Sequence, residues 1–534
     1  MKKQVLSALA FCSALGIAQA QTDVTKEYLV NPSFETLKAA DGATEVAVKT
    51  KLENGLLGWE VADMNDYQVE SEASRSATGF PADGSGKIKP TEGTYYYFNR
   101  VGWSNKDSEL KTTTSKELPA GTYYAVIDYK AADYSNNNNA NNNGTTIGIK
   151  VNGAASDLLG ENPAVRRAYS IANNGSNPGN DAYMVNAAWN ELGTMFTVTE
   201  PTTVTISLVQ NMKNHGRSDI AWDNLRLYQI ENVSENKPMD VSGLITTSNY
   251  YALGGWNIEG GNTFQVNTWS TEGEKDGSGM TTPFIQDHVG KENKAANATI
   301  SHTVNHLIPG IYEVSGLIRV LNEAGGDTPS GATLYANEGS TNACNGNPCT
   351  NGVYGTYTVK GTVGTDGVLT FGIKVANANF NWVSFKNFKL QYLGAASIEQ
   401  LQATLKEKIE EAKAYVENCP KGIAAIVNAA ITQGDNAQPT EESLNAAIAA
   451  LTQAIALAEE TAPATEAFKT LMATCQGYAG HSSAEESVKQ AFQKAMSDAQ
   501  AALDAATTAE AIQEATQALQ TACETYVLSA EPET

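Results

Sequence analysis

Six side chains in this sequence combine aromatic or hydrogen-bonding chemistry with loop surroundings. Sugars are bound by aromatic faces against their C–H surfaces and by polar side chains that hydrogen-bond their hydroxyls. An aromatic residue in a polar loop is therefore a better candidate than one in a strand. The candidate ligand-binding residues are Trp103, Arg167, Trp189, Asn211, His215 and Trp269. A packing role is the alternative for Trp103 and Trp189.

The remaining tryptophans have other expected roles. Trp256 and the segment 379–382 are further aromatic candidates in the second half of the chain. Within that segment, we expect Trp382 to pack in the core.

Catalytic chemistry has no comparable signal. His302 and His306 are four residues apart, but they lie in the alternating stretch 299–307, where four residues span about 13 Å. The sequence has no His-Glu-x-x-His, Gly-x-Ser-x-Gly or phosphate-loop motif. The carboxylate pair of a glycosidase needs no fixed spacing, and no pair stands out here. We therefore predict a protein that is not an enzyme, with a glycoside-active enzyme as the alternative.

The cysteines suggest covalent links. Cys344 and Cys349 bracket the turn-forming sequence Asn-Gly-Asn-Pro, which predicts a small disulfide loop. Zinc is the alternative, but this pair lacks further nearby ligands. Cys475 and Cys523 lie on two predicted helices, and we predict a second disulfide between them. Cys419 remains as a partly buried thiol.

The elements that must position these residues change character along the chain. Residues 21–232 consist of short alternating runs broken by Gly, Asn and Pro, and residues 240–394 repeat this rhythm. Many short strands separated by turn signals indicate antiparallel β-sandwiches. The sequence therefore predicts two β-sandwich domains.

Landmarks in these two segments recur in the same order. The run Leu-Pro-Ala-Gly-Thr-Tyr at 118–123 has its counterpart in Leu-Ile-Pro-Gly-Ile-Tyr at 307–312. The run Trp-Asp-Asn-Leu-Arg-Leu at 222–227 matches Phe-Lys-Asn-Phe-Lys-Leu at 385–390. These matches predict that the second sandwich is a diverged copy of the first.

From residue 395 onward alanine and glutamine dominate and the apolar spacing becomes helical. Ser397 with Gln400 has the spacing of a capping box. Breaks such as Ala-Pro-Ala at 462–464 predict about six helices, arranged as three-helix repeats over 396–461 and 464–529. This acidic, alanine-rich region suits a spacer or a surface that binds a protein partner.

The first residues and the charge indicate where the protein works. Lys2 and Lys3 precede a short apolar run and the small-x-small sequence ending at Ala20, which predicts a signal peptide over 1–20 and an exported protein, periplasmic or extracellular. Cys12 resembles a lipidation site, but Phe11 stands where a small residue is required. The net charge of −23 and the lack of a basic stripe argue against nucleic-acid binding. No later stretch is apolar over the roughly 20 residues of a membrane helix.

Several motifs together resemble a known family. They are Tyr-Leu-Val-Asn-Pro-Ser-Phe-Glu at 28–35, Gly-Trp at 58–59, the turn at 118–123 and Trp-Asp-Asn-Leu-Arg-Leu-Tyr at 222–228. In this order they resemble the galactose-binding-like jelly-roll modules of carbohydrate-binding proteins exported by Gram-negative glycan-degrading anaerobes. Residues 240–394 resemble the same modules more weakly, and the C-terminal third resembles FIVAR-type helical repeats. The resemblance implies that Trp59 and Trp222 pack in the core.

The resemblance implies a structural calcium ion in the first sandwich. Glu35 and Asp223 would be its carboxylate ligands, with backbone carbonyls completing the oxygen shell that a hard cation prefers. Ordinary strand-edge and turn roles are the alternative for these two residues. In the second sandwich Lys386 stands where Asp223 stands in the first, so no calcium is expected there.

Taken with the resemblance, these features predict an exported, non-catalytic protein that binds polysaccharide or glycoconjugate through its sandwiches. The alternative is an adhesin or scaffold that binds a protein partner through the acidic helical region.

Overall fold

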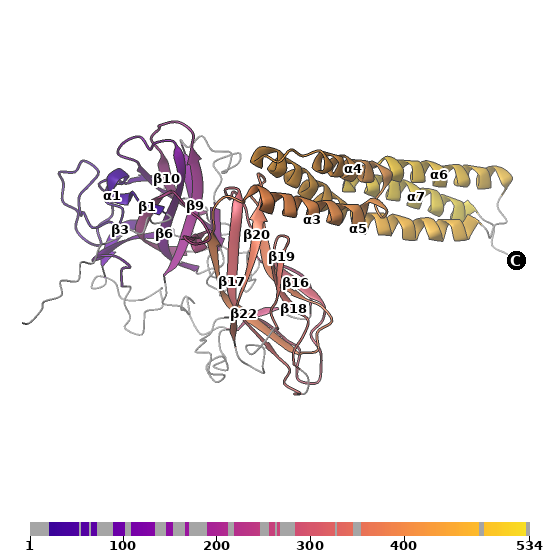
Figure 1. Ribbon diagram of the computed structural model, residues 1–534, viewed down its shortest axis with the longest axis horizontal. Coiled ribbons are helices and arrows are strands. Elements are labelled where there is room, and N and C mark those ends of the chain that lie inside the picture. Colours follow the sequence, from indigo (N-terminus) through magenta and orange to yellow (C-terminus); the bar gives the residue numbers. More distant parts are fainter. Residues whose placement is uncertain are drawn as a thin grey trace, which may run out of the picture. The chain divides into compact units, whose positions relative to one another are not determined.

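The computed structural model describes residues 21–52, 55–62, 66–71, 89–101, 108–133, 146–152, 166–169, 189–211, 218–245, 256–261, 264–267, 284–325, 328–344, 354–479 and 485–529. The chain divides into two compact units. One, here called the β unit, comprises residues 1–363 and 367–395, and the other, the helical unit, comprises residues 364–366 and 396–534. Two antiparallel β-sandwiches therefore precede an all-α region, as the sequence predicts (Figure 1).

The first sandwich has two antiparallel sheets. The strands of the larger sheet are β1 (Gln21–Asp23), β3 (Asp66–Ser71), β4 (Tyr95–Val101), β6 (Gly121–Asp133), β9 (Asn190–Val198) and β11 (Ser218–Ile230). Their order is β3-β4-β11-β6-β9, with β1 paired to β11, and the four-residue helix α1 (Thr25–Tyr28) follows β1. The smaller sheet has the order β2-β5-β10-β7-β8. Its strands are β2 (Glu60–Ala62), β5 (Ser108–Thr113), β7 (Thr146–Asn152), β8 (Arg166–Tyr169) and β10 (Thr205–Asn211).

The second sandwich repeats this plan. Its larger sheet contains β12 (Met239–Asp240), β14 (Gln265–Asn267), β15 (Phe284–His288), β17 (Gly310–Leu321), β20 (Gly355–Val363) and β22 (Trp382–Tyr392). The order is β14-β15-β22-β17-β20, with β12 on β22, which matches the first sandwich strand for strand. The smaller sheet, β13-β16-β21-β18-β19, consists of β13 (Trp256–Gly260), β16 (Ala298–Val304), β18 (Ala332–Ala336), β19 (Gly339–Asn342) and β21 (Leu369–Val375).

Local details confirm that the sequence landmarks are equivalent. The hydroxyl of Tyr123 donates to the carbonyl of Pro119, and the hydroxyl of Tyr312 donates to that of Ile308, both at 2.9 Å. The last long strand of each sandwich has a bulge at its Asn, with Asn224 at φ 55° and Asn387 at φ 53°. Asparagine tolerates this left-handed conformation better than most residues.

Each larger sheet has one face on its own core and one outer face. In β6, Tyr123, Ala125, Ile127 and Tyr129 belong to the core of the first sandwich, so the alternate residues lie on the outer face. In β17 the core residues are Val314, Ile318 and Val320. Trp59 and Trp222, each 1% exposed, lie in the first core as predicted.

The two sandwiches share buried side chains. Tyr124, Val126 and Met195 lie on the outer face of the first sandwich, but they belong to the hydrophobic cluster of the second. The short 3-10 helix η2 (Ser242–Leu244) contacts β9, and the Tyr312 hydroxyl lies 3.6 Å from the Met195 sulfur. The part of the outer face formed by these residues of β6 and β9 is thus covered by the second sandwich.

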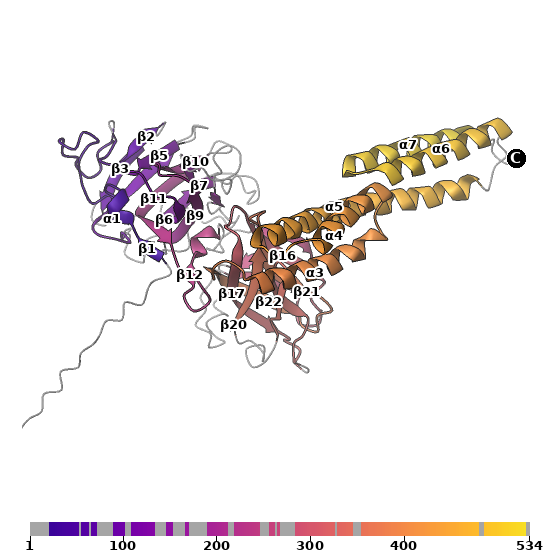
Figure 2. The same ribbon diagram turned by 45° about the horizontal axis from the view of Figure 1, so that its top comes forward.

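The helical unit differs from the prediction in one respect. Its described helices are α3 (Ile398–Val416), α4 (Lys421–Asp435), α5 (Glu441–Ala479), α6 (Glu486–Ala505) and α7 (Ala509–Ser529). Figure 2 shows α5 running past α3 and α4 and then on beside α6 and α7. The predicted break at 462–464 is wrong, since α5 continues through Pro463, and among the described residues there are five such helices instead of six. Both three-helix groups share α5.

Buried packing on both sides of Pro463 explains why α5 continues. Thr461 donates to the carbonyls of Leu457 and Ala458, and Thr465 donates to the carbonyl of Thr461. Both threonines are buried, so tertiary packing outweighs the proline's local cost. The capping box of Ser397 and Gln400 is confirmed.

The cysteine predictions have different outcomes. Cys475 on α5 and Cys523 on α7 are brought into hydrogen-bond contact, but as thiols and not as the predicted disulfide. Both are buried between helices, and burial, together with the neighbouring Cys523, raises the pKa of the Cys475 thiol. Cys349 lies outside the described residues, and so does the predicted loop that it would close.

Candidate functional site

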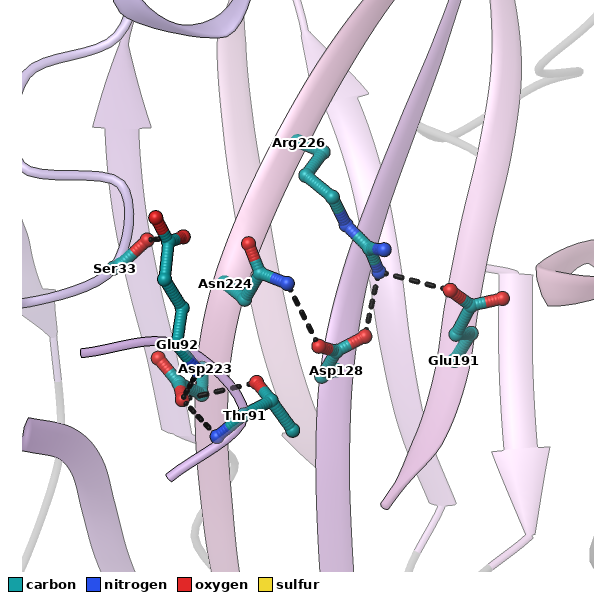
Figure 3. Close-up of polar contacts among 8 residues, drawn as sticks. All are labelled: Ser33, Thr91, Glu92, Asp128, Glu191, Asp223, Asn224 and Arg226. Atoms are coloured by element: carbon teal, nitrogen blue, oxygen red, sulfur yellow. Dashed lines mark hydrogen bonds and ion pairs between the residues drawn. The ribbon is translucent and has the colours of Figure 1, made fainter. Parts of the chain in front are cut away.

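Two carboxylates anchor one turn of the first sandwich. The turn precedes β4, and Asp223 of β11 binds its start: Oδ2 accepts hydrogen bonds from the Thr91 amide at 2.7 Å, the Thr91 hydroxyl at 3.0 Å and the Glu92 amide at 3.1 Å. Glu35 binds its end, accepting from the amides of Thr94 and Tyr95 at 2.8–3.0 Å. The structure therefore brings the two predicted metal ligands onto one turn. Figure 3 shows Asp223 beside Thr91 and Glu92.

Asp223 is an unusual carboxylate. It is 0% exposed, and its Oδ1 is buried with no hydrogen-bond partner among the described residues. Burial raises its pKa to about 7, because the opposing effects of Thr91, Glu92 and the Asn224 backbone amide only partly offset the cost of removing a charge from water. An unpartnered buried carboxylate oxygen is an expensive arrangement unless a cation or a proton completes it.

The fit of this turn to a calcium ion rests mainly on Asp223. Its Oδ1 suits a hard cation, whereas both oxygens of Glu35 are already occupied by amide donors. Glu92 extends from the same turn, and its Oε2 accepts from the Ser33 hydroxyl at 2.6 Å. Within the described part of the chain no three His, Cys, Asp or Glu side chains converge as a metal site. A bound ion would therefore need hydroxyl or carbonyl oxygens in addition to carboxylates.

Next to this turn, the outer face carries an ionic network. Asp128 of β6 accepts a hydrogen bond from the side-chain amide of Asn224 at 3.0 Å and pairs with Arg226 (Figure 3). Arg226 also pairs with Glu191 of β9 at 3.0 Å. Asp128 is buried and Arg226 half-buried. Because one guanidinium bridges both carboxylates, the network ties β6, β9 and β11 together.

Trp189 lies just before β9, above the same face. Its indole N–H donates to the Lys89 carbonyl at 2.8 Å, and its ring meets Tyr96 edge-on at 6.2 Å and 73°. The Lys130 ammonium lies 5.5 Å from the indole centroid, although Lys130 is only 3% exposed. The indole itself is half-buried, so part of it remains available to a ligand.

The second sandwich has the same arrangement at equivalent positions. Tyr354 lies just before β20 as Trp189 lies before β9, and it meets Phe284 of β15 edge-on at 6.4 Å and 66°. Arg319 of β17 takes the place of Lys130, with its guanidinium 4.9 Å from the Tyr354 ring. The guanidinium also lies 4.1 Å from Trp382, whose indole N–H donates to Gln286. The same arrangement of two aromatic rings and one cation thus occurs at equivalent positions of both sandwiches.

Sequence reasoning missed most of this second cluster. Trp382 is buried, as expected, but on the outer face with Phe284 and Tyr354, and not in the main core. His288 stacks on Trp382 at 4.6 Å and pairs with Glu323 at 2.7 Å. The sequence did contain a signal for this cluster, because the matched landmarks show which residues of the two copies correspond. Trp256, by contrast, is a core residue, packed against Phe371, Phe385 and Phe388.

The other predicted ligand-binding residues are not gathered at this cluster. Trp103, His215 and Trp269 lie outside the described residues. Arg167 lies on β8 opposite Gly148, and Asn211 ends β10 opposite Thr146. Both strands belong to the smaller sheet, whereas Trp189 borders the larger one.

Comparison with known proteins gives only distant likenesses. No family model matches the chain, and no curated protein matches it. Similar solved structures include TmCBM61 in complex with beta-1,4-galactotriose, at 15% identity and TM-score 0.23, covering 38% of this chain and 97% of that one. Another is the CBM22-1–CBM22-2 tandem of Paenibacillus barcinonensis Xyn10C, at 10% identity and TM-score 0.21, covering 71% and 99%. A Paenibacillus xanthan lyase matches at 13% identity and TM-score 0.20, covering 62% and 26%. At such identities and TM-scores, function has to be argued from the chain's own residues.

Proposed function

We propose that this protein is an exported, non-catalytic carbohydrate-binding protein that captures polysaccharide or glycoconjugate through its two β-sandwiches. The observation that carries the proposal is the half-buried indole of Trp189 beside Tyr96 and Lys130. Phe284, Tyr354 and Arg319 repeat this geometry in the second sandwich, where all three are buried. Aromatic faces bind the apolar side of a sugar ring, and neighbouring cations and hydroxyls hydrogen-bond its polar edge.

Position supports a binding role for the cluster. Trp189 and Tyr354 each lie immediately before an edge strand of their larger sheet, β9 and β20 respectively. The half-buried indole of Trp189 is fixed by its hydrogen bond to Lys89, so little conformational freedom is lost when a ligand stacks on it. If both sandwiches bind, weak binding by each is strengthened when both engage one polymer.

Export and calcium are further parts of the proposal. Cleavage after Ala20 would leave β1, which begins at Gln21 and pairs with β11, intact. A calcium ion at Asp223 would neutralise the buried carboxylate and fix the turn that precedes β4. Mass spectrometry of the N-terminal peptide of the secreted protein tests whether cleavage follows Ala20.

The binding test uses the mature full chain in affinity electrophoresis against plant, host and microbial polysaccharides. We expect one glycan class to retard the wild type. Trp189→Ala should weaken that retardation by roughly tenfold in dissociation constant, since about 1.4 kcal/mol of ring contact is lost. Trp189→Phe should retain most of it. Tyr478→Ala, which removes an exposed ring of the helical unit, is the matched control and should change nothing.

Two outcomes would count against the proposal. If no glycan retards the wild type, carbohydrate capture is rejected, and a protein partner for the acidic helical unit becomes the better hypothesis. If a glycan is bound and its reducing ends increase during incubation, the non-catalytic assignment is wrong.

A further inference from the structure

The shared bulge fixes a residue-by-residue correspondence between the outer faces of the two sandwiches. In each larger sheet three successive cross-strand rows lie on this face. In the first sandwich the rows are Ala221–Lys130, Asp223–Asp128–Glu191 and Arg226–Val126–Gly193. In the second they are Ser384–Arg319, Lys386–Leu317–Thr356 and Lys389–Ser315–Thr358. Neighbouring rows are about 7 Å apart, because side chains on one face recur every second residue.

The charges in these rows have diverged. The first-sandwich rows carry Lys130 and Arg226 against the carboxylates of Asp128, Glu191 and Asp223. In the second sandwich all three carboxylates are replaced, by Leu317, Thr356 and Lys386. Each row then carries one cation, Arg319, Lys386 or Lys389, and the one in the middle row is new. A nearly balanced face has become a cationic one.

Part of this cationic face is open to solvent. Lys389, Thr356 and Thr358 are exposed, whereas Arg319 and Lys386 are buried and act as fixed charges beneath them. Glu313 lies in the next row, directly across from Lys360, whose ammonium pairs with Glu235 at 2.9 Å. Glu323 is bound by His288 and Asn381.

We infer that the outer face of the second sandwich binds an acidic polysaccharide, one whose sugars carry carboxylates. This inference rests on the proposed carbohydrate-binding function and adds the class of sugar. The Lys389 ammonium pairs with a uronate carboxylate, the hydroxyls of Thr356 and Thr358 bind sugar hydroxyls, and the buried cations favour the anion from below. The net charge of −23 does not prevent this, since charges more than about 8 Å apart are largely screened at physiological ionic strength.

The test compares two forms of one polymer with the full-length mature protein. Polygalacturonate and its carboxyl-reduced, neutral product are titrated separately at low and at physiological salt. We expect the acidic form to bind, with an affinity that falls as salt rises, and its reduced form to lose at least roughly tenfold in affinity. Lys389→Glu and Thr356→Glu, both at exposed positions, should weaken binding of the acidic form by a similar factor. Lys374→Glu, an exposed lysine on the smaller sheet of the same sandwich, is the control and should bind as the wild type.

The outcomes separate this inference from the function on which it rests. Equal binding of the acidic and reduced polymers, or of wild type and Lys389→Glu, overturns the acidic-sugar assignment and leaves carbohydrate binding standing. If neither polymer nor any neutral glycan binds, both are rejected. Unchanged unfolding midpoints of the variants show that any loss is a loss of contact and not of fold.

Discussion

Asp223 illustrates how one residue can be both a structural anchor and a candidate ion ligand. Its Oδ2 holds the Thr91–Glu92 turn, while Oδ1 is buried with no described partner. In the second sandwich the same position is Lys386, whose pKa is lowered by burial. The Lys386 ammonium could therefore take the place that a calcium ion bound to Asp223 would occupy in the first sandwich.

Removal of calcium should expose this role. We expect millimolar calcium to raise the unfolding midpoint of the wild type relative to the EDTA-treated protein, because a ligand at about 100 times its Kd adds about 2.7 kcal/mol of stability. Asp223→Asn should abolish the rise, whereas Glu191→Gln, a carboxylate bound to Arg226 and not to the turn, should keep it. Differential scanning calorimetry checks this. A calcium response that persists in Asp223→Asn would place the ion elsewhere, and no response in the wild type would refute the site.

At the scale of elements, α5 shows tertiary packing overriding a local signal. A proline in a helix interior removes one hydrogen bond and costs about 3 kcal/mol. Pro463 nevertheless lies within α5, which packs against α3 and α4 along one part and α6 and α7 along the other. Since Pro463 is exposed, its ring contributes little packing in return.

Replacing this proline should therefore stabilise the helical unit. We expect Pro463→Ala to raise the free energy of unfolding by about 1–3 kcal/mol, as the missing hydrogen bond is restored. Pro463→Gly should give a smaller gain, because glycine is costlier in a helix by about 1 kcal/mol. Urea unfolding of the full chain followed by circular dichroism at 222 nm measures both. A less stable Pro463→Ala protein would show that proline is required at this position.

Among the helices that the structure describes, none has the length and apolar character of a membrane span.

Within the β unit, the two sandwiches are joined by more than a linker. Met195 is 0% exposed although it points away from its own core, since the cluster around Tyr312 and Val241 covers it. Domains that share buried apolar surface unfold together when that surface is a large part of their stability.

A charge placed in this shared surface should uncouple the sandwiches. We expect the wild-type β unit to unfold in one calorimetric transition and Met195→Glu to split it in two. The substitution buries a carboxylate in the shared surface and leaves the first sandwich's own core untouched. Thr197→Glu, two residues along the same face and half-buried, is the control. Two transitions in the wild type would contradict the coupling.

The sequence by itself determined the local features of this protein. Alternating apolar residues predicted the strands, the run at 118–123 and its counterpart at 307–312 predicted the duplication, and Ser397 with Gln400 predicted where α3 begins. These signals depend on neighbours within a few residues, so they can be read from the chain alone.

Only the tertiary structure decided which distant side chains meet. Alternation says that Lys130 and Arg319 lie on a sheet face, but not which rings lie on the next strand, because strand order is fixed by packing and not by sequence proximity. The contacts of Arg319 with Tyr354 and Trp382, the carboxylates on the turn before β4 and the continuous α5 all arise in this way. The candidate site is therefore partly visible in the sequence as residue types, and becomes a constellation only when the sheets form.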